Sequence, residues 1–260
     1  MKKLAILDEA QTKTTGVSII LPTLNEAGNI ASLIQSTVAA LQSAGINEIQ
    51  IIVVDDDSPD RTWEIASKVI CPPAQIEVIR RMEKHGLTAS LSDGIEAARQ
   101  AVIVWLDCDF SHPPERIPQM LYMLDQGFDV VVNSRYVVGG GEDRSGEWGA
   151  MQMFLSLSLN WFTRFFLDPA FADYTSGFVT VRRNVIQAIC LHGDYGEYFV
   201  DFIFRALRKK YRVCELPYQA MPRSSGESKT GTNLLQFLRR GRKYVVTVVR
   251  LRLAAMLGRL

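Results

Sequence analysis

The chain has 260 residues, of which 47% are hydrophobic and 22% are charged, and these proportions are ordinary for a globular protein. This length is enough for a large α/β domain, with or without a short appendage. No stretch is both long enough and free enough of charge to predict a transmembrane helix, because Arg250 and Arg252 interrupt the best candidate. The apolar run at the start is also too short for a signal peptide.

The chain alternates apolar, strand-like runs with stretches of helical spacing. Strands are predicted over residues 17–21, 49–54, 75–79, 102–106 and 129–132, and helices over residues 30–44 and about 88–99. This alternation predicts an α/β fold with a mostly parallel central sheet flanked by helices. Because the carboxyl ends of parallel strands share one edge, the polar residues that follow them are expected to collect there.

The predicted strand over residues 102–106 leads directly into Asp107, Cys108 and Asp109. Side chains of a strand alternate between its two faces, so both carboxylates are expected on the same side of the sheet. Two hard oxygen ligands there could hold Mg²⁺ or Mn²⁺, with water and substrate phosphates completing the shell. Cys108 is interpreted as a small filler of this site, since hard cations prefer oxygen. An isolated Asp-x-Asp can also be a pair of solvated loop residues, so its meaning depends on context.

That context is an ordered series of motifs along the chain. They are PTLNE at 22–26, VVDDDSPD at 53–60, KHGLTAS at 84–90, DCDFSHPPE at 107–115, NSRY at 133–136 and RSSGESK at 223–229. In this order they resemble the inverting glycosyltransferases of family 2, and among them the dolichol-phosphate mannose synthase group. The resemblance covers residues 17–229 and implies the GT-A fold of nucleotide-diphospho-sugar transferases. The glycine patterns of a Rossmann dinucleotide site and of a P-loop are both absent.

The resemblance implies that a nucleotide-sugar donor binds where the first strands end. Asp56 is matched to a residue that accepts hydrogen bonds from base or ribose. The other positions expected to line the donor site are Pro22, Asn25, Glu26, Lys84 and Gly86. Lys84 could contact the diphosphate or simply be solvated, whereas Gly86 is expected to allow close approach of the backbone.

The implied reaction moves a sugar, mannose from GDP-mannose above all, onto the phosphate of a polyprenol, with inversion at the anomeric carbon. A metal ion on Asp107 and Asp109 would stabilise the departing diphosphate. The acceptor phosphate is already an anion, so a general base can be dispensed with. Asp201 falls where family members that act on hydroxyl groups keep their base, and it is a candidate on that ground, although an acid in the first turns of a helix also stabilises the helix.

Binding the acceptor phosphate calls for cations. Arg135 follows the strand over residues 129–132, and Arg223, Ser228 and Lys229 match the R-x-x-G-x-S-K pattern of the mannose synthases. Two positions depart from that group, which commonly carries a basic residue ahead of the segment that begins here at Gln152, and another where Val179 stands. These departures bear on the lipid acceptor more than on the donor.

Two segments favour contact with a membrane. Residues 154–167 are densely apolar and aromatic, and the tail over residues 234–260 mixes apolar residues with arginines and lacks acids. A basic amphipathic helix can lie in a membrane interface, but a core-packed helix with a solvated basic face explains the tail equally well. A membrane subunit could also use this surface. The chain is therefore divided into a GT-A glycosyltransferase domain, residues 1–230, and a basic amphipathic helical segment, residues 231–260.

The cysteines have neither metal-ligand spacing nor a disulfide pattern, which fits a reducing compartment. We therefore expect a transferase attached peripherally to the cytoplasmic face of a membrane, without a nucleic-acid partner. One alternative is a family 2 transferase that uses UDP-glucose or UDP-N-acetylglucosamine. Another is a noncatalytic nucleotide-sugar-binding subunit, which is disfavoured because both carboxylates and the R-x-x-G-x-S-K pattern are retained.

Overall fold

A computed structural model of the chain describes residues 13–142, 149–222 and 234–260. These residues build a seven-stranded sheet with the order β3-β2-β1-β4-β7-β5-β8, together with a two-stranded sheet of β6 and β9. The strands are β1 (Gly16–Thr23), β2 (Glu48–Asp55), β3 (Gln75–Arg80), β4 (Val102–Trp105), β5 (Val130–Ser134), β6 (Gly141–Glu142), β7 (Val179–Arg182), β8 (Val213–Pro217) and β9 (Gln219–Ala220). The α/β fold with a mostly parallel central sheet is confirmed.

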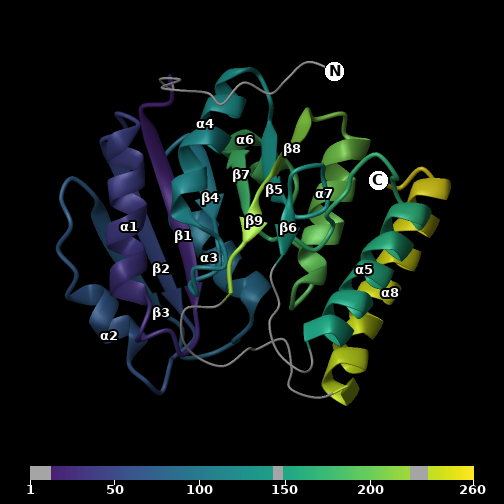
Figure 1. Cartoon of the computed structure of the whole chain (residues 1–260), viewed down its shortest axis with the longest axis horizontal. Coiled ribbons are helices and arrows are strands. Elements are labelled where there is room, and N and C mark those ends of the chain that lie inside the picture. Colours follow the sequence, from purple (N-terminus) through teal and green to yellow (C-terminus); the bar gives the residue numbers. More distant parts are fainter. Residues whose placement is uncertain (1–12, 143–148, 223–233) are drawn as a thin grey trace.

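Helices cover both faces of the large sheet (Figure 1). They are α1 (Ile30–Ser43), α2 (Thr62–Ser67), α3 (Leu87–Ala97), α4 (Ile117–Asp125), α5 (Gly149–Phe166), α6 (Arg183–Ala188), α7 (Glu197–Arg208) and α8 (Leu234–Met256), with a 3₁₀ turn at Pro114–Arg116. The alternation of β1 separates two apolar clusters: Ile19 and Leu21 pack with α1 and α4, whereas Ile20 packs with α3 and α7. Because β1 is buried on both faces and pairs with β2 and β4, it anchors the sheet.

Strand β7 runs antiparallel between β4 and β5, and the sequence pattern does not predict it. Its first residue, Val179, lies opposite Trp105 at the end of β4 and opposite Val132 in β5. The start of β7 is therefore at the edge where its parallel neighbours end. As a result, the segment before β7, residues 173–178, meets the segments that follow β4 and β5.

Helix α8 packs against α7 and α5 along one side of the molecule (Figure 1). Val248 and Leu251 are fully buried in the same apolar cluster as the inner face of α7. The expected boundary at residue 230 lies outside the described residues, and the division into two parts stays a prediction. Within the described ranges, we find no helix whose length and apolar character would let it cross a membrane.

Candidate active site

The turn after β4 carries the two candidate metal ligands. β4 ends at Trp105, and residues 106–112 leave the sheet instead of continuing it. Asp107 is exposed, whereas Asp109 is only 5% exposed. The two carboxylates therefore differ in exposure, and strand alternation cannot place them, because β4 ends two residues before Asp107. That both lie on the same side of the sheet stays a prediction. Cys108 is buried in the apolar cluster beneath the turn, as expected of a filler.

Hydrogen bonds within the turn fix its shape. One carboxylate oxygen of Asp109 accepts the backbone N–H of Ser111 at 2.9 Å and its hydroxyl at 2.5 Å. The backbone N–H of Asp107 donates to Nδ1 of His112 at 3.0 Å. Between these contacts, Phe110 adopts a left-handed conformation with φ of 64°, which is unfavourable for a residue other than glycine. The carboxylates are therefore presented by a turn held at both ends.

The donor set of this turn suits a hard divalent cation. Asp107 and Asp109 offer carboxylate oxygens, which Mg²⁺ and Mn²⁺ prefer. In the part of the chain that the structure describes, no group of three or more His, Cys, Asp or Glu side chains could hold a metal ion. A pair of carboxylates fits an ion that keeps water and binds substrate phosphates, as Mg²⁺ typically does.

The residues after β1 interlock with those after β2. Glu26 is nearly buried and accepts a hydrogen bond from the Asn29 side chain at 2.8 Å, just before α1. The backbone N–H of Asn25 donates to the Ser58 hydroxyl at 2.9 Å, and the Pro22 carbonyl lies 3.4 Å from Sγ of Cys108. These contacts bring the ends of β1, β2 and β4 together at one edge, as predicted.

Asp56 has an unexpected partner in Arg81. One of its oxygens accepts hydrogen bonds from the Arg81 guanidinium and, at 2.8 Å, from the Ser90 hydroxyl. The other accepts the backbone N–H of Gly86 at 2.7 Å. Arg81 also donates to the Lys84 carbonyl at 2.5 Å, so this buried ion pair shapes residues 81–86. Contact of Asp56 with base or ribose stays a prediction.

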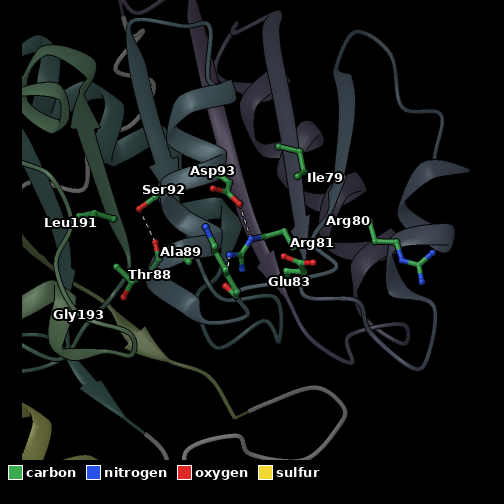
Figure 2. A pocket seen from close by; sticks show the side chains of 11 residues that line it. Ile79, Arg80, Arg81, Glu83, Thr88, Ala89, Ser92, Asp93, Leu191 and Gly193 are labelled. Atoms are coloured by element: carbon green, nitrogen blue, oxygen red, sulfur yellow. Dashed lines mark hydrogen bonds and ion pairs between the residues drawn. The ribbon is translucent and has the colours of Figure 1, made fainter.

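A pocket of about 540 Å³ lies beside this segment (Figure 2). It is bounded by the end of β3, one side of α3, and Leu191 and Gly193. In Figure 2, an ion pair of 2.6 Å joins Arg81 to Asp93 at its wall. Lys84 lines the pocket, but Asp107 and Asp109 do not. The pocket is therefore distinct from the carboxylate turn.

Arg135 is committed to a buried ion pair. Its backbone N–H and Nε both donate to one oxygen of Asp173, at 3.0 and 2.9 Å, and an Nη atom donates to the other at 2.8 Å. Further donors reach Thr175 at 2.7 Å and Glu142 at 3.3 Å. Burial alone would lower the pKa of Arg135 and raise that of Asp173, but their mutual attraction outweighs burial and shifts both pKa values the other way. This corrects the expectation that Arg135 is a cation available to the acceptor phosphate.

Asp201 is likewise a structural carboxylate. Its side chain is completely buried, with oxygens 2.6 Å from Arg205, 2.9 Å from Arg250 on α8 and 3.2 Å from His192. It has no exposed surface through which to meet an acceptor hydroxyl. Asp201 is therefore a buried counter-ion that joins α7 to α8, and the expectation that it is a catalytic base is corrected.

Arg223, Ser228 and Lys229 lie outside the described residues, as does the side chain of Gln152. Val179 is fully buried at the start of β7, so an apolar side chain stands where the mannose synthase group commonly has a cation.

Sequence reasoning missed an aromatic layer beneath the carboxylate turn. The imidazole of His112 stacks on Phe178, with ring centroids 4.9 Å apart and planes 16° apart. Tyr218 meets His112 edge-on at 6.1 Å. His112 belongs to the DCDFSHPPE motif, so its sequence position was a signal, but its partner Phe178 precedes the unpredicted strand β7.

Residues 18–190 match the family described as glycosyl transferase family 2. A dolichol-phosphate mannosyltransferase of Pyrococcus furiosus is 34% identical over 226 residues, which cover 86% of this chain and 62% of that protein. A polyprenol monophosphomannose synthase of Mycolicibacterium smegmatis is 32% identical over 224 residues, covering 83% and 82%. The chain belongs to glycosyl transferase family 2.

Two further comparisons widen this picture. An undecaprenyl-phosphate 4-deoxy-4-formamido-L-arabinose transferase of Edwardsiella ictaluri is 28% identical over 83% of this chain and 63% of its own length. The chain thus spans less than two thirds of this protein and of the Pyrococcus protein. Glucosyl-3-phosphoglycerate synthase from Mycobacterium tuberculosis, solved with Mn²⁺, UDP-glucose and phosphoglyceric acid, superimposes with a TM-score of 0.71 at 17% identity, covering 94% and 82% of the two chains. That likeness shows the shared fold.

Proposed function

We propose that the protein transfers mannose from GDP-mannose to a polyprenyl phosphate, with inversion and with Mg²⁺ or Mn²⁺. The observation that carries this proposal is the 32% identity to a polyprenol monophosphomannose synthase over 82% of that enzyme's length. Three relatives are named for lipid phosphates, namely dolichol phosphate, polyprenol phosphate and undecaprenyl phosphate, and two of them for mannose. A lipid-phosphate acceptor is therefore supported more broadly than the sugar.

Asp107 and Asp109 are the residues that would hold the metal ion. When bound, the ion supplies a Lewis acid that stabilises the charge on the departing diphosphate. Ser111 fixes one oxygen of Asp109, so the orientation of this carboxylate is set by the turn itself. An acceptor phosphate oxygen attacks the anomeric carbon opposite the leaving group, which inverts the configuration. Because that oxygen is already anionic, no proton has to be removed, and the burial of Asp201 is consistent with this chemistry.

Arg223, Ser228 and Lys229 are proposed to bind the acceptor phosphate. The backbone N–H of Met221 donates to the Ser111 carbonyl at 3.3 Å. The chain therefore enters the R-x-x-G-x-S-K segment directly beside the carboxylate turn. With Arg135 neutralised by acids, this segment is the stronger source of cations for the acceptor.

The proposed membrane contact is an apolar ridge on the outer faces of α5 and α8. Its exposed side chains are Phe154, Leu157, Trp161 and Phe165 on α5, and Val246, Val249, Leu253 and Met256 on α8. Arg242, Arg252 and Arg259 are also exposed on or just after α8. Apolar burial combined with attraction to anionic lipid would bring this ridge to the cytoplasmic face of a membrane. A membrane subunit is the alternative occupant.

A transfer assay on the full chain tests the reaction. With Mn²⁺ and a short-chain polyprenyl phosphate in detergent, GDP-mannose should yield mannosyl-phosphopolyprenol and GDP. Asp107→Asn and Asp109→Asn should each lower kcat by roughly a hundredfold or more, since a metal ligand is lost, while Tm stays near that of the unchanged protein.

Glu115→Gln is the matched control, because Glu115 is an exposed acid of the same motif, and it should leave the rate unchanged. A panel of UDP-sugars tests the second candidate, a UDP-sugar transferase; glucosyl-3-phosphoglycerate synthase, which shares the fold, was solved with UDP-glucose. Turnover of UDP-glucose with none of GDP-mannose would overturn the proposed donor.

A further inference from the structure

His112 lies directly beneath the carboxylate turn. Its side chain is buried, with 4% of the residue exposed. One face of the ring stacks on Phe178, from the segment before β7, and Tyr218 closes the edge. Phe178 is itself held by its carbonyl, which accepts the backbone N–H of Asn133 at 3.0 Å. The imidazole therefore rests on a rigid platform contributed by distant parts of the chain.

The hydrogen bond to Asp107 fixes how this ring is used. A backbone N–H can only donate, so Nδ1 of His112 is the acceptor and the ring proton lies on Nε2. The contact reaches the main chain of Asp107 rather than its carboxylate. The hydrogen bond therefore fixes the backbone position from which the Asp107 side chain extends, and it does not engage the carboxylate oxygens.

The turn needs such a restraint because Phe110 is held in the left-handed region, which its side chain disfavours. Ser111 restrains the turn on the Asp109 side. His112 restrains it on the Asp107 side through the backbone N–H, so the two ends of the turn are held by separate contacts.

We propose that His112 is a positioning residue for the metal site: through Nδ1 it fixes the Asp107 backbone, and thereby the relative placement of the two carboxylates. This inference rests on the proposed function, in which Asp107 and Asp109 hold the metal ion of the metal–nucleotide complex. Residues behind metal ligands commonly change metal affinity by 10–100-fold when replaced.

Two substitutions separate positioning from packing. His112→Phe keeps an aromatic ring for the stack on Phe178 but has no acceptor. His112→Asn loses the ring, yet its Oδ1 is as many bonds from Cβ as Nδ1 is and can accept the Asp107 N–H. Mn²⁺ titrations of the full chain with GDP present should show affinity weakened about tenfold or more in His112→Phe, and retained within roughly threefold in His112→Asn.

Thermal unfolding provides the contrasting measurement. We expect His112→Phe to match or exceed His112→Asn in Tm, because it retains the buried ring. Metal affinity and stability should thus rank the variants in opposite order. A folded His112→Phe protein with unchanged Mn²⁺ affinity would overturn the proposal, whatever the behaviour of His112→Asn, as would a greater loss of affinity in His112→Asn.

Failure of the proposed function gives a different result. If the unchanged protein binds no Mn²⁺ with GDP, or if Asp109→Asn binds it normally, the metal site itself is wrong. If those two controls behave as expected and only the His112 ranking fails, the transferase stands and the positioning role falls.

Discussion

The role inferred for Arg135 changes once its partners in the fold are known. As a basic residue after a strand, it resembles a phosphate ligand. In the fold, its side chain is 9% exposed and that of Asp173 is completely buried. Charges removed from water in this way are tolerated when they are paired with good geometry. The pair fastens the end of β5 to the segment that precedes β7.

Replacing Arg135 should therefore unfold the protein more readily. Arg135→Ala leaves Asp173 buried without its cation, which is expected to reduce the free energy of unfolding by about 3–5 kcal/mol. Urea unfolding followed by circular dichroism measures this change. Arg99→Ala, which removes an exposed pair with Glu77, is the control and should cost about 1 kcal/mol or less. Equal, small losses in both variants would show that the buried pair is unimportant for stability.

At the scale of single residues, the sequence predicted where side chains lie better than it predicted which side chains they contact. The rule that polar residues after parallel strands share one edge correctly brings Asp56 and the Asp107–Asp109 pair to the same side of the molecule. It did not identify Arg81 or Asp173 as partners of Asp56 and Arg135. Asp173 in particular precedes its strand, and only the reversed direction of β7 brings it to that edge.

At the scale of elements, α8 packs one stripe on the core and exposes another, while contact of the exposed stripe with a membrane stays a proposal. Val248 and Leu251 face the core, while Val246 and Val249 face outward. The helical pattern was readable from the sequence, as were α1 and α3 to within about two residues. Which stripe of α8 packs inward could not be read, because it depends on the surface of α7 and on the buried carboxylate of Asp201.

Two arginines of α8 offer a direct test of this docking. Both side chains are exposed, that of Arg250 to 55%, but Arg250 donates to Asp201 at 2.9 Å. Arg250→Ala should lower the free energy of unfolding by about 1–2 kcal/mol, because a hydrogen bond to a buried carboxylate is lost while Arg205 remains. Arg252→Ala should change it by less than about 0.5 kcal/mol. Denaturant titration distinguishes the two, and indistinguishable midpoints would show that the Arg250 contact contributes nothing to docking.

At the scale of the whole molecule, the apolar ridge and the basic tail lie on the same side. α5 and α8 run next to each other at one margin of the sheet (Figure 1). Large exposed apolar surface is commonly an interaction site. The sequence identified both segments, but only the fold shows that the two helices pack against each other.

Cosedimentation with phosphatidylglycerol vesicles tests the ridge. The full chain should bind at low salt and bind less as ionic strength rises, since part of the attraction is electrostatic. Trp161→Ser combined with Phe165→Ser should reduce binding by roughly tenfold or more, because two large aromatic side chains are removed from the interface. Ile70→Ser is the control, since Ile70 is also exposed and follows α2 (Thr62–Ser67), a helix on the side of the molecule away from α5 and α8 (Figure 1). Full-length protein that ignores these vesicles at low salt would favour a protein partner for the ridge.

The reversed direction of β7 also has a consequence for how this chain can evolve by recombination. Residues 107–112 and 173–178 are separated in the chain by α4, β5 and α5, yet His112 and Phe178 form one stack. A change in one ring alters the stack that the other makes. Recombination that exchanges only one of the two segments would therefore join the carboxylate turn of one parent to the aromatic partner of another.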